Sequence, residues 1–589
     1  MQKRNTMKLS KIRKILTNQY FIIALITLLA LFLRLLNIEK PCGLWYDEML
    51  TYVFSSKSFP FGIMKTLLRY DFHMPLYYMY VHVWMKLFGI NDTVLRYSSV
   101  LWGVLTIPAF FYLGKIYRSK NLGYLLAIIG ALSPIMIYYS QEFRFYSMLT
   151  FLSTISIIFF LRLIETPNKK DFLFFFLSNL IILYIYTMGI IWVGIETLIL
   201  LTHYYFYKKD YFSRLTKYAA VFFLVSIPYL ILLFSDINAS NNSLIDPLTD
   251  SGLKYYSIFI FLNNLFSPFI AGIKGSEIDK YKIFLKFPAT SLILFFLSSA
   301  TLCFITGFIS SLRKFNKKSL YLITILISFL SVEIFLCIQQ CFVLRIKYAI
   351  IILPIFFLIC CDGLLLIKTK KLKHFLIGLI ILVFIYNSVH YKKMESYSLR
   401  SSFIAFSAVD LKKLHLDKND FVLYPNGQEL LKKYVSNVQF IDFDIPSLLY
   451  LDKTKQERLK VFDKQFVLTT NKKNSPQKLI PYLLNPKPTN ELKLFLNSSV
   501  KKIKRGNKLA FFEYTGLGNS TDVANMVISL NSGKDIKTKQ KKYKEMLLSL
   551  LYVKINSDIK NALDENQELK RIKEIPPSKE WRIFVYEKQ

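Results

Sequence analysis

Glycine, proline, cysteine and acidic residues are all scarce in this chain of 589 residues, which has 20 Gly, 19 Pro, 6 Cys and 39 Asp+Glu. So few glycines and prolines exclude a collagen-like or low-complexity chain. The cysteines lie mostly within apolar runs and form neither a disulfide framework nor a metal-ligand spacing. The abundant residues are hydrophobic (53%) and aromatic (16%), and the mean hydropathy is +0.35. This composition excludes a soluble globular protein and predicts a polytopic α-helical membrane protein.

Basic residues outnumber acidic ones by 76 to 39, which gives a formal net charge of +37. A large excess of this kind can indicate nucleic-acid binding. Here, however, Lys and Arg lie between the apolar runs, where they set membrane topology. We therefore expect no nucleic-acid partner. The first apolar run has no A-x-A-like site after it, so it is interpreted as a membrane span rather than a cleavable signal peptide.

Eleven apolar runs are predicted to cross the bilayer, which takes roughly 17–25 residues each. A leader with six basic residues and no acidic one precedes the first run, and five basic loops follow even-numbered runs. Because basic loops stay in the cytoplasm, the N-terminus is expected there, with the loops 39–93 and 236–286 and residues 391–589 outside. The heavy use of Lys, Ile, Asn and Phe fits an AT-rich genome and favours a bacterial inner (plasma) membrane. The predicted spans are 20–38, 94–116, 121–139, 147–164, 172–188, 189–207, 218–235, 287–308, 319–338, 348–367 and 375–390.

Residues 75–89 are apolar but number only fifteen, and counting them as a span would invert every later loop. They are predicted to form an amphipathic helix along the membrane surface. The chain is thus expected to divide into a transmembrane domain, 1–390, and an extracytoplasmic α/β domain, 391–589.

The second domain is predicted from alternating strand-like and helix-like stretches. Segments 500–514 and 569–587 look alike, either as an internal repeat or as two lysine-rich edge hairpins. The strand-like runs are 421–427, 438–444, 465–470, 508–515 and 581–588, and the helix-like ones are 426–436 and 541–555.

Two groups of candidate site residues lie in the first external loop. Asp47 and Glu48 are adjacent carboxylates among aromatic residues at the membrane interface, where burial can perturb their pKa values; a solvated acidic pair is the alternative. Asp71 and His73 precede Pro75, which suits a first helical turn. His73 would then lie at the positive end of the surface helix, where phosphate binding is favoured, although a lone histidine is more often structural. Tyr77 follows on the same helix.

A third group lies in the external turn between the third and fourth spans, where Arg144 departs from the rule that basic residues stay inside. Glu142 is close enough to pair with it, and this pair is the structural alternative to a functional role. The same turn holds Gln141 and Tyr146.

A fourth group precedes the tenth span, where Arg345 and Lys347, followed by Tyr348, are again external cations. Two such cations suit a phosphate at headgroup level, and snorkelling to lipid headgroups is the alternative. Arg96, at the external end of the second span, is adequately explained by snorkelling. Charge topology alone places all of these carboxylates and cations on one external face, as an enzyme acting on a phosphate-bearing lipid requires.

The order of these motifs resembles that of GT-C fold glycosyltransferases. It is most similar to the glycosyltransferase family 39-like group, related to dolichyl-phosphate-mannose protein mannosyltransferases and bacterial lipid A aminoarabinose transferases. The resemblance covers about 20–367, and it departs from the Glu-Lys-Pro-Pro motif of the aminoarabinose transferases, since this chain has Phe72-His73-Met74-Pro75. The motifs are Asp47-Glu48, H-x-PLYY (73–78), LFG (87–89), L-R-x-S (95–98), YSQE-x-R-x-Y (139–146) and R-x-K-Y (345–348) with Pro354 six residues on.

The resemblance implies transfer of a sugar from a polyprenyl-phosphate donor to an extracytoplasmic acceptor, with inversion at the anomeric carbon. It implies that Asp47, with Glu48 beside it, acts as the general base or binds the acceptor, and it implies phosphate contacts near His73. Elementary chemistry agrees, because a carboxylate must take the acceptor's proton and cations such as Arg144, Arg345 and Lys347 must hold the leaving phosphate. Arg96, Asp71, Tyr77, Gln141, Glu142 and Tyr146 are the expected substrate-positioning residues.

Four questions stay open at this point. A lipid-linked sugar transporter or flippase would place ionisable residues at mid-membrane; only Glu196 and Glu333 lie there, and neither has an evident partner in the sequence. A sensor whose spans merely anchor the external domain is a third class. No cofactor is certain, although a divalent metal is compatible with Asp47, Glu48 and Glu142. The external domain, with 37 Lys+Arg against 22 Asp+Glu, could dock an anionic acceptor of the cell envelope.

Overall fold

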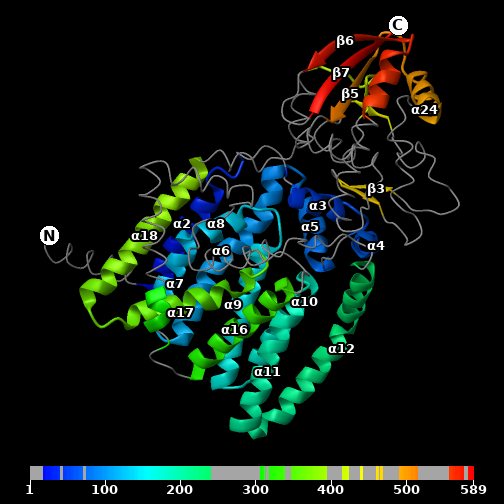
Figure 1. The fold of residues 1–589 in the computed structure, drawn as a ribbon. Helices are drawn as coiled ribbons and strands as arrows, with labels where there is room; N and C mark the ends of the chain where they lie inside the picture. Colours follow the sequence, from blue (N-terminus) through cyan, green and yellow to red (C-terminus); the bar gives the residue numbers. More distant parts are fainter. Residues whose placement is uncertain are drawn as a thin grey trace, which may run out of the picture. The chain divides into compact units, whose positions relative to one another are not determined.

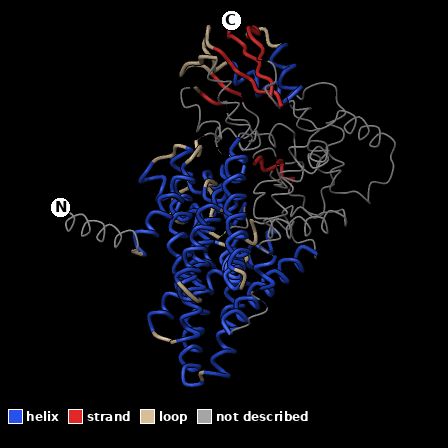
Figure 2. The backbone as a smooth tube through the Cα atoms, turned by 90° about the vertical axis from the view of Figure 1, so that its left-hand side faces the viewer, coloured by secondary structure: helices blue, strands red, loops and turns tan. Residues whose placement is uncertain are grey.

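The chain folds into two compact units, one formed by Met1–Pro41 with Leu50–Leu399 and the other by Cys42–Met49 with Arg400–Gln589. The computed structural model describes residues 18–39, 44, 46–70, 74–240, 305–310, 312, 317–338, 347–393, 414–423, 438–441, 459–462, 465–468, 490–514, 556–575 and 581–589. In the described part, the first unit is helical and the second holds the strands (Figures 1 and 2).

The helices of the first unit follow the predicted apolar runs. A helix lies at ten of the eleven predicted positions, and the eighth, 287–308, falls mostly outside the described residues. The bounds are α2 (Gln19–Leu35), α3 (Tyr46–Ser55), α4 (Phe61–Tyr70), α5 (Pro75–Phe88), α6 (Asp92–Tyr117), α7 (Lys120–Leu132), α8 (Pro134–Ser140), α9 (Tyr146–Glu165), α10 (Lys169–Ile185), α11 (Gly189–Tyr207), α12 (Lys209–Ser240), α16 (Lys317–Ile338), η2 (Ile350–Ile352), α17 (Leu353–Leu366) and α18 (Lys370–Lys393).

Four of the described helices, α6, α9, α11 and α16, are long and apolar enough by themselves to cross a membrane. The bent pair α7 and α8 makes a fifth if it is one span. The predicted total of eleven spans stays a prediction.

The third predicted span, 121–139, is not one continuous helix. It consists of α7 and α8, which meet at an angle of 59°. Pro134 has no N–H to donate and disfavours a helical residue before it, so Ser133 adopts φ −59° and ψ 120° and the helix breaks there. The predicted span 121–139 therefore contains a break, which its apolar composition did not indicate.

The surface helix is present as α5, which begins at Pro75 and ends before Gly89, whose φ of +91° favours glycine. Pro75, Tyr77, Tyr78 and Val81 form its buried face. Pro75 and Tyr78 are three residues apart and Tyr77 and Val81 are four apart, so the set lies on one side of the helix. The location of α5 along a membrane surface remains a prediction.

A buried arginine donates hydrogen bonds to backbone carbonyls at the break between α7 and α8. Arg34 of α2 is 0% exposed, and its Nη2 donates to the Gly130 carbonyl at 3.1 Å. In a regular helix that carbonyl would accept from residue 134, which here is a proline without an N–H. The same guanidinium donates to the Ala131 carbonyl at 3.3 Å and to Ser140 Oγ at 3.2 Å. Arg34 therefore joins α2 to both halves of the broken helix.

The end of α2 is satisfied in return by the segment that follows α8. Gln141 Nε2 donates to the carbonyl oxygens of Arg34 at 2.7 Å and Leu36 at 3.1 Å. Arg96 Nη1 of α6 donates to the Ile38 carbonyl at 3.3 Å. The two bonds from Gln141 occupy carbonyls at the end of α2 that have no partner inside the helix, and they fix the turn beginning at Gln141 against α2.

Close approach of α6 to this junction depends on Gly103. A Cβ at that position would lie 2.7 Å from Ser140 Cβ and 3.0 Å from Arg34 Nε. Position 103 therefore has room only for glycine, because a Cβ there would clash with Ser140 and Arg34. Gly194 in α11 has no atom within 4 Å of the equivalent Cβ position.

We predict that Gly103→Ala lowers the apparent melting temperature of the detergent-solubilised protein relative to Gly194→Ala. Both changes gain the same helix propensity, about 1 kcal/mol, but only the first overpacks a buried junction, at a cost of about 1–3 kcal/mol. Equal melting temperatures for the two variants would contradict this account of the junction.

The second unit contains a mixed five-stranded sheet in the order β2-β1-β5-β7-β6. β1 pairs in parallel with β2 and β5, whereas β7 pairs antiparallel with β5 and β6. The bounds are β1 (Phe421–Leu423), β2 (Gln439–Phe440), β5 (Lys508–Tyr514), β6 (Leu569–Ile575) and β7 (Trp581–Lys588), with β3 (Leu459–Phe462) and β4 (Gln465–Leu468) in a separate hairpin.

All five predicted strand-like runs contain a strand, and β2 is shorter than predicted. The two similar segments differ in structure. Segment 569–587 forms the antiparallel hairpin of β6 and β7, whereas 500–514 holds the end of helix α24 (Asn490–Val500), a turn and β5. The sequence did not predict β6 as a separate strand because its middle is charged, as suits an exposed edge. The predicted helices 426–436 and 541–555 lie outside the described residues; a helix is present at 556–564.

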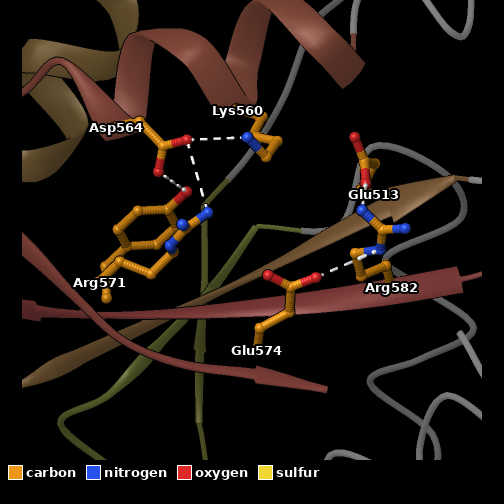
Figure 3. Close-up of polar contacts among 7 residues, drawn as sticks. Glu513, Lys560, Asp564, Arg571, Glu574 and Arg582 are labelled. Carbon is orange, nitrogen blue, oxygen red and sulfur yellow. Dashed lines mark hydrogen bonds and ion pairs between the residues drawn. The ribbon is translucent and has the colours of Figure 1, made fainter. Parts of the chain in front are cut away.

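Charged side chains of the second unit gather around Asp564 (Figure 3). Its carboxylate accepts from Lys560 Nζ at 2.9 Å and from the Tyr586 hydroxyl at 2.9 Å, and Arg571 Nη1 lies 3.8 Å away. Burial raises the pKa of the Tyr586 phenol, so this hydroxyl keeps its proton and remains a donor.

A second group in the same figure is centred on Arg582. Its guanidinium lies 3.8 Å from the Glu513 carboxylate and 3.5 Å from that of Glu574. Burial raises the pKa of Glu513, and the charge of Arg582 opposes that rise. The cations Lys560, Arg571 and Arg582 all lie within 6 Å of the Phe584 ring centroid, at 5.2, 5.6 and 5.9 Å. In this cluster three cations face three carboxylates, so they balance one another.

Candidate functional site

The acidic pair begins a helix. Asp47 and Glu48 occupy the first turn of α3, where the helix dipole favours negative charge. Asp47 is half-buried and Glu48 is 1% exposed. The alternative of a solvated pair is therefore wrong for Glu48.

One turn further along α3, Thr51 contacts the turn between the third and fourth predicted spans. Arg144 is 3% exposed, and its Nη1 donates to Thr51 Oγ1 at 3.0 Å. The Arg144 carbonyl accepts from Ser99 Oγ of α6 at 3.1 Å. Asp47 precedes Thr51 by four residues, so the two side chains lie on the same face of α3. The predicted pairing of Arg144 with Glu142 stays a prediction.

Tyr77 of α5 joins the same group of side chains. Its hydroxyl lies 3.5 Å from Ser99 Oγ, and its ring centroid is 6.0 Å from that of Phe145. Burial raises the pKa of the Tyr77 phenol, while the nearby charge of Arg144 lowers it by less. The phenol therefore keeps its proton and can donate a hydrogen bond.

Tyr186, at the end of α10, connects this group to the segment before α17. Its ring lies 5.8 Å from that of Phe145, and its hydroxyl donates to the Tyr348 carbonyl at 2.5 Å. Lys347 Nζ lies 5.4 Å from the Tyr348 ring centroid. Tyr146 is buried, with its ring 4.8 Å from that of Phe145.

These contacts join side chains from α3, α5, α6, the turn 141–145, α9 and the end of α10 to the backbone of Tyr348. Gln141 and Glu142 are buried in that turn. Arg96 is 2% exposed and bonded to a backbone carbonyl, so its interpretation as a snorkelling side chain was wrong. The predicted site residues Asp71, His73 and Arg345 lie outside the described residues.

Comparison with solved structures identifies the fold. ArnT from Cupriavidus metallidurans in the apo state superposes with a TM-score of 0.50 at 10% sequence identity, and the match covers 96% of this chain and 97% of that one. The chain has the GT-C fold. It is a multi-pass membrane protein.

Two further matches have lower TM-scores. ArnT bound to undecaprenyl phosphate gives 0.48 at 9% identity, covering 96% of this chain and 97% of that one. Archaeal oligosaccharyltransferase AglB from Archaeoglobus fulgidus, in complex with an inhibitory peptide and a dolichol-phosphate, gives 0.41 at 11% identity, covering 97% and 88%. No protein-family model and no curated protein sequence matches the chain.

Several residues that build the site in this GT-C fold were missed by sequence reasoning. Thr51 and Ser99 are small hydroxyl residues whose contacts lie 93 and 45 residues away along the chain. Tyr186 sits among many other aromatic residues at span ends. Arg34 did offer a signal, because an arginine inside an apolar run needs polar partners.

The described residues do not bring three or more His, Cys, Asp or Glu side chains together as metal ligands. The carboxylates Asp47, Glu48 and Glu142 remain the groups that could bind a divalent cation, since oxygen ligands suit such ions.

A buried carboxylate in the helix bundle has partners that the sequence did not indicate. Glu196 Oε2 of α11 accepts from Ser156 Oγ of α9 at 2.5 Å and from Asn179 Nδ2 of α10 at 3.0 Å. The expectation that Glu196 lacks a partner was therefore wrong, because both donors come from other helices. Glu333 of α16 is fully buried, and its two carboxyl oxygens accept no hydrogen bond from the described residues.

We predict that removing these two carboxylates changes the stability of the protein differently. Glu196→Leu leaves the Ser156 and Asn179 donors without an acceptor and is expected to cost about 1–3 kcal/mol. Glu333→Leu replaces an unbonded polar group with an apolar one and is expected to be neutral or stabilising. Melting temperatures in one detergent check this, and a larger loss for Glu333→Leu than for Glu196→Leu would refute it.

Proposed function

We propose that the protein is an inverting membrane glycosyltransferase that moves a sugar from a polyprenyl-phosphate donor to an extracytoplasmic acceptor. The observation that carries the proposal is the buried guanidinium of Arg144, bonded to Thr51 one turn after the Asp47-Glu48 pair. It supports a carboxylate and a cation acting on one substrate within a GT-C fold. The solved structure of the ArnT protein with undecaprenyl phosphate supports the lipid class of the donor.

In the proposed reaction Asp47 is the general base. An acceptor hydroxyl loses its proton to the Asp47 carboxylate while its oxygen bonds to the anomeric carbon of the sugar. The bond between that carbon and the phosphate oxygen breaks on the opposite side, which inverts the configuration. General-base assistance of this kind contributes roughly 10²–10⁴-fold to the rate. Glu48 would help to stabilise positive charge on the sugar ring in the transition state.

The leaving group is a polyprenyl phosphate, which carries away the bonding electrons and needs cations rather than a general acid. Arg144 and Lys347 are proposed to hold it, together with Arg345 and His73. Preorganised cations stabilise developing charge without rearranging during the reaction. The proposed substrate-positioning residues are Asp71, Tyr77, Arg96, Gln141, Glu142 and Tyr146.

The proposed topology places this chemistry outside the cell membrane. Eleven spans put the N-terminus in the cytoplasm and residues 391–589 in the extracytoplasmic space, in a bacterial inner membrane. The donor would enter sideways between spans with its tail in the bilayer. An anionic acceptor docked on the C-terminal domain is not favoured at the cluster of Figure 3, where three cations are matched by three carboxylates.

We predict that Asp47→Asn reduces transfer by about 10²–10⁴-fold, because the amide cannot take the acceptor's proton. Asp92→Asn is the matched control, since Asp92 also lies in the first turn of a helix, α6. The purified proteins are given a panel of polyprenyl-phosphate sugars and an envelope extract, and free polyprenyl phosphate and labelled acceptor are measured.

Equal donor consumption by wild type and Asp47→Asn would remove Asp47 as the base. If no donor is consumed and the protein instead moves lipid-linked sugar across vesicles, the transferase proposal fails in favour of a flippase. A parallel reaction with chelator tests the divalent metal, because a metal-dependent enzyme loses activity there and regains it when the ion is added back.

A further inference from the structure

A pocket of about 290 Å³ lies between the start of α10 and the first turns of α12, away from the candidate transfer site. Its walls come from two stretches of the chain that are about forty residues apart and pack against each other (Figure 1). The lining residues are Pro167, Asn168, Lys169, Phe172, Tyr211, Lys217, Tyr218 and Val221.

Aromatic packing makes one wall of this pocket rigid. The rings of Phe172 and Tyr218 stack with centroids 4.8 Å apart and planes inclined by 12°. Tyr204 packs edge-on against Phe172 at 6.1 Å. One turn further along both helices, Phe176 and Phe222 are in contact at 5.2 Å. These ring contacts pack α10 against α12 beside the pocket, and we call the pocket together with the exposed side chains next to it on the two helices the groove.

Two lysines supply the positive charge of this pocket. Lys169 and Lys217 are exposed, and no described residue pairs with either ammonium group. Asp171, two residues after Lys169, is paired with Arg162, whose Nε lies 3.0 Å from it, and Asn168 also donates to it. Asn168 also caps α10 by accepting from the Asp171 N–H at 2.9 Å. The charged residues that line the pocket are therefore these two lysines, which lie beside its aromatic and apolar lining.

Below the lysines the groove continues into exposed apolar surface. Val221, Leu224 and Val225 of α12 are all exposed, as is Leu177 of α10. Lys217, Val221 and Leu224 follow the spacing of one helix face. The order along this face is cationic at the helix ends and apolar beyond, which matches the order of an anionic lipid from headgroup to acyl chains.

We propose that this groove binds an anionic phospholipid, with the phosphate between Lys169 and Lys217 and the acyl chains along the apolar side chains of α10 and α12. Basic pockets between membrane helices bind anionic headgroups in this way. In the proposed topology the site lies in the cytoplasmic leaflet, opposite the transfer site. It is independent of the proposed transferase reaction, since it rests on the pocket and its charge alone.

The test is lipid retention by the full-length protein in detergent, measured by native mass spectrometry. Phosphatidylglycerol and phosphatidylcholine with identical acyl chains are compared, with inorganic phosphate as a competitor. We expect saturable binding of one phosphatidylglycerol in preference to phosphatidylcholine. Lys169→Gln/Lys217→Gln should weaken it about tenfold or more, whereas Lys170→Gln/Lys209→Gln, which removes the same charge outside the pocket, should change it less than about twofold.

Val221→Trp fills the groove without changing charge and should also block retention. Three results would overturn the proposal: equal losses in both double variants, unchanged retention in Val221→Trp, or complete displacement by inorganic phosphate, which would make the site one for a free anion. Melting temperatures of all variants in lipid-free detergent show that each is folded.

Discussion

The hydrogen bond from Arg34 to the Gly130 carbonyl is the interaction on which the break between α7 and α8, and the turn that follows α8, depend. Pro134 removes the N–H that this carbonyl would accept from within its own helix, so α7 can end there only if another donor replaces it. A charged donor in an apolar interior is well suited, because hydrogen bonds to charged groups are about twice as strong as neutral ones. At the break, the axis of α8 is inclined by 59° to that of α7, and the turn 141–145 follows α8.

That turn links the fold to the proposed chemistry. Gln141, at the start of the turn, donates a hydrogen bond to the end of α2. Arg144, near the end of the turn, donates one to Thr51 of α3, the helix that begins with the acidic pair. Phe145 and Tyr186 extend the contact to Tyr348. A site assembled from so many parts of the chain is held by rigid helices, as a reaction that needs preorganised charge requires.

The positions of the helices in the first unit could be predicted from sequence, because they depend on local apolarity. The turn 139–146 and α5 were located for that reason. The topology drawn from loop charge stays a prediction. The contacts that complete the site could not be predicted, since Thr51, Ser99 and Tyr186 carry no local signal and act through partners on other helices. Arg96 was misread for the same reason, because a buried arginine and a snorkelling one look alike in sequence. Glu196 likewise has donors only on neighbouring helices.

The most direct test of the central claim is the affinity of the purified protein for undecaprenyl phosphate, compared between wild type and Arg144→Gln. The account predicts saturable binding by wild type and a loss of about tenfold or more in the folded variant, because a buried guanidinium forms charge-assisted hydrogen bonds to phosphate. Unchanged affinity in a folded Arg144→Gln protein would contradict the claim that this turn holds the donor phosphate.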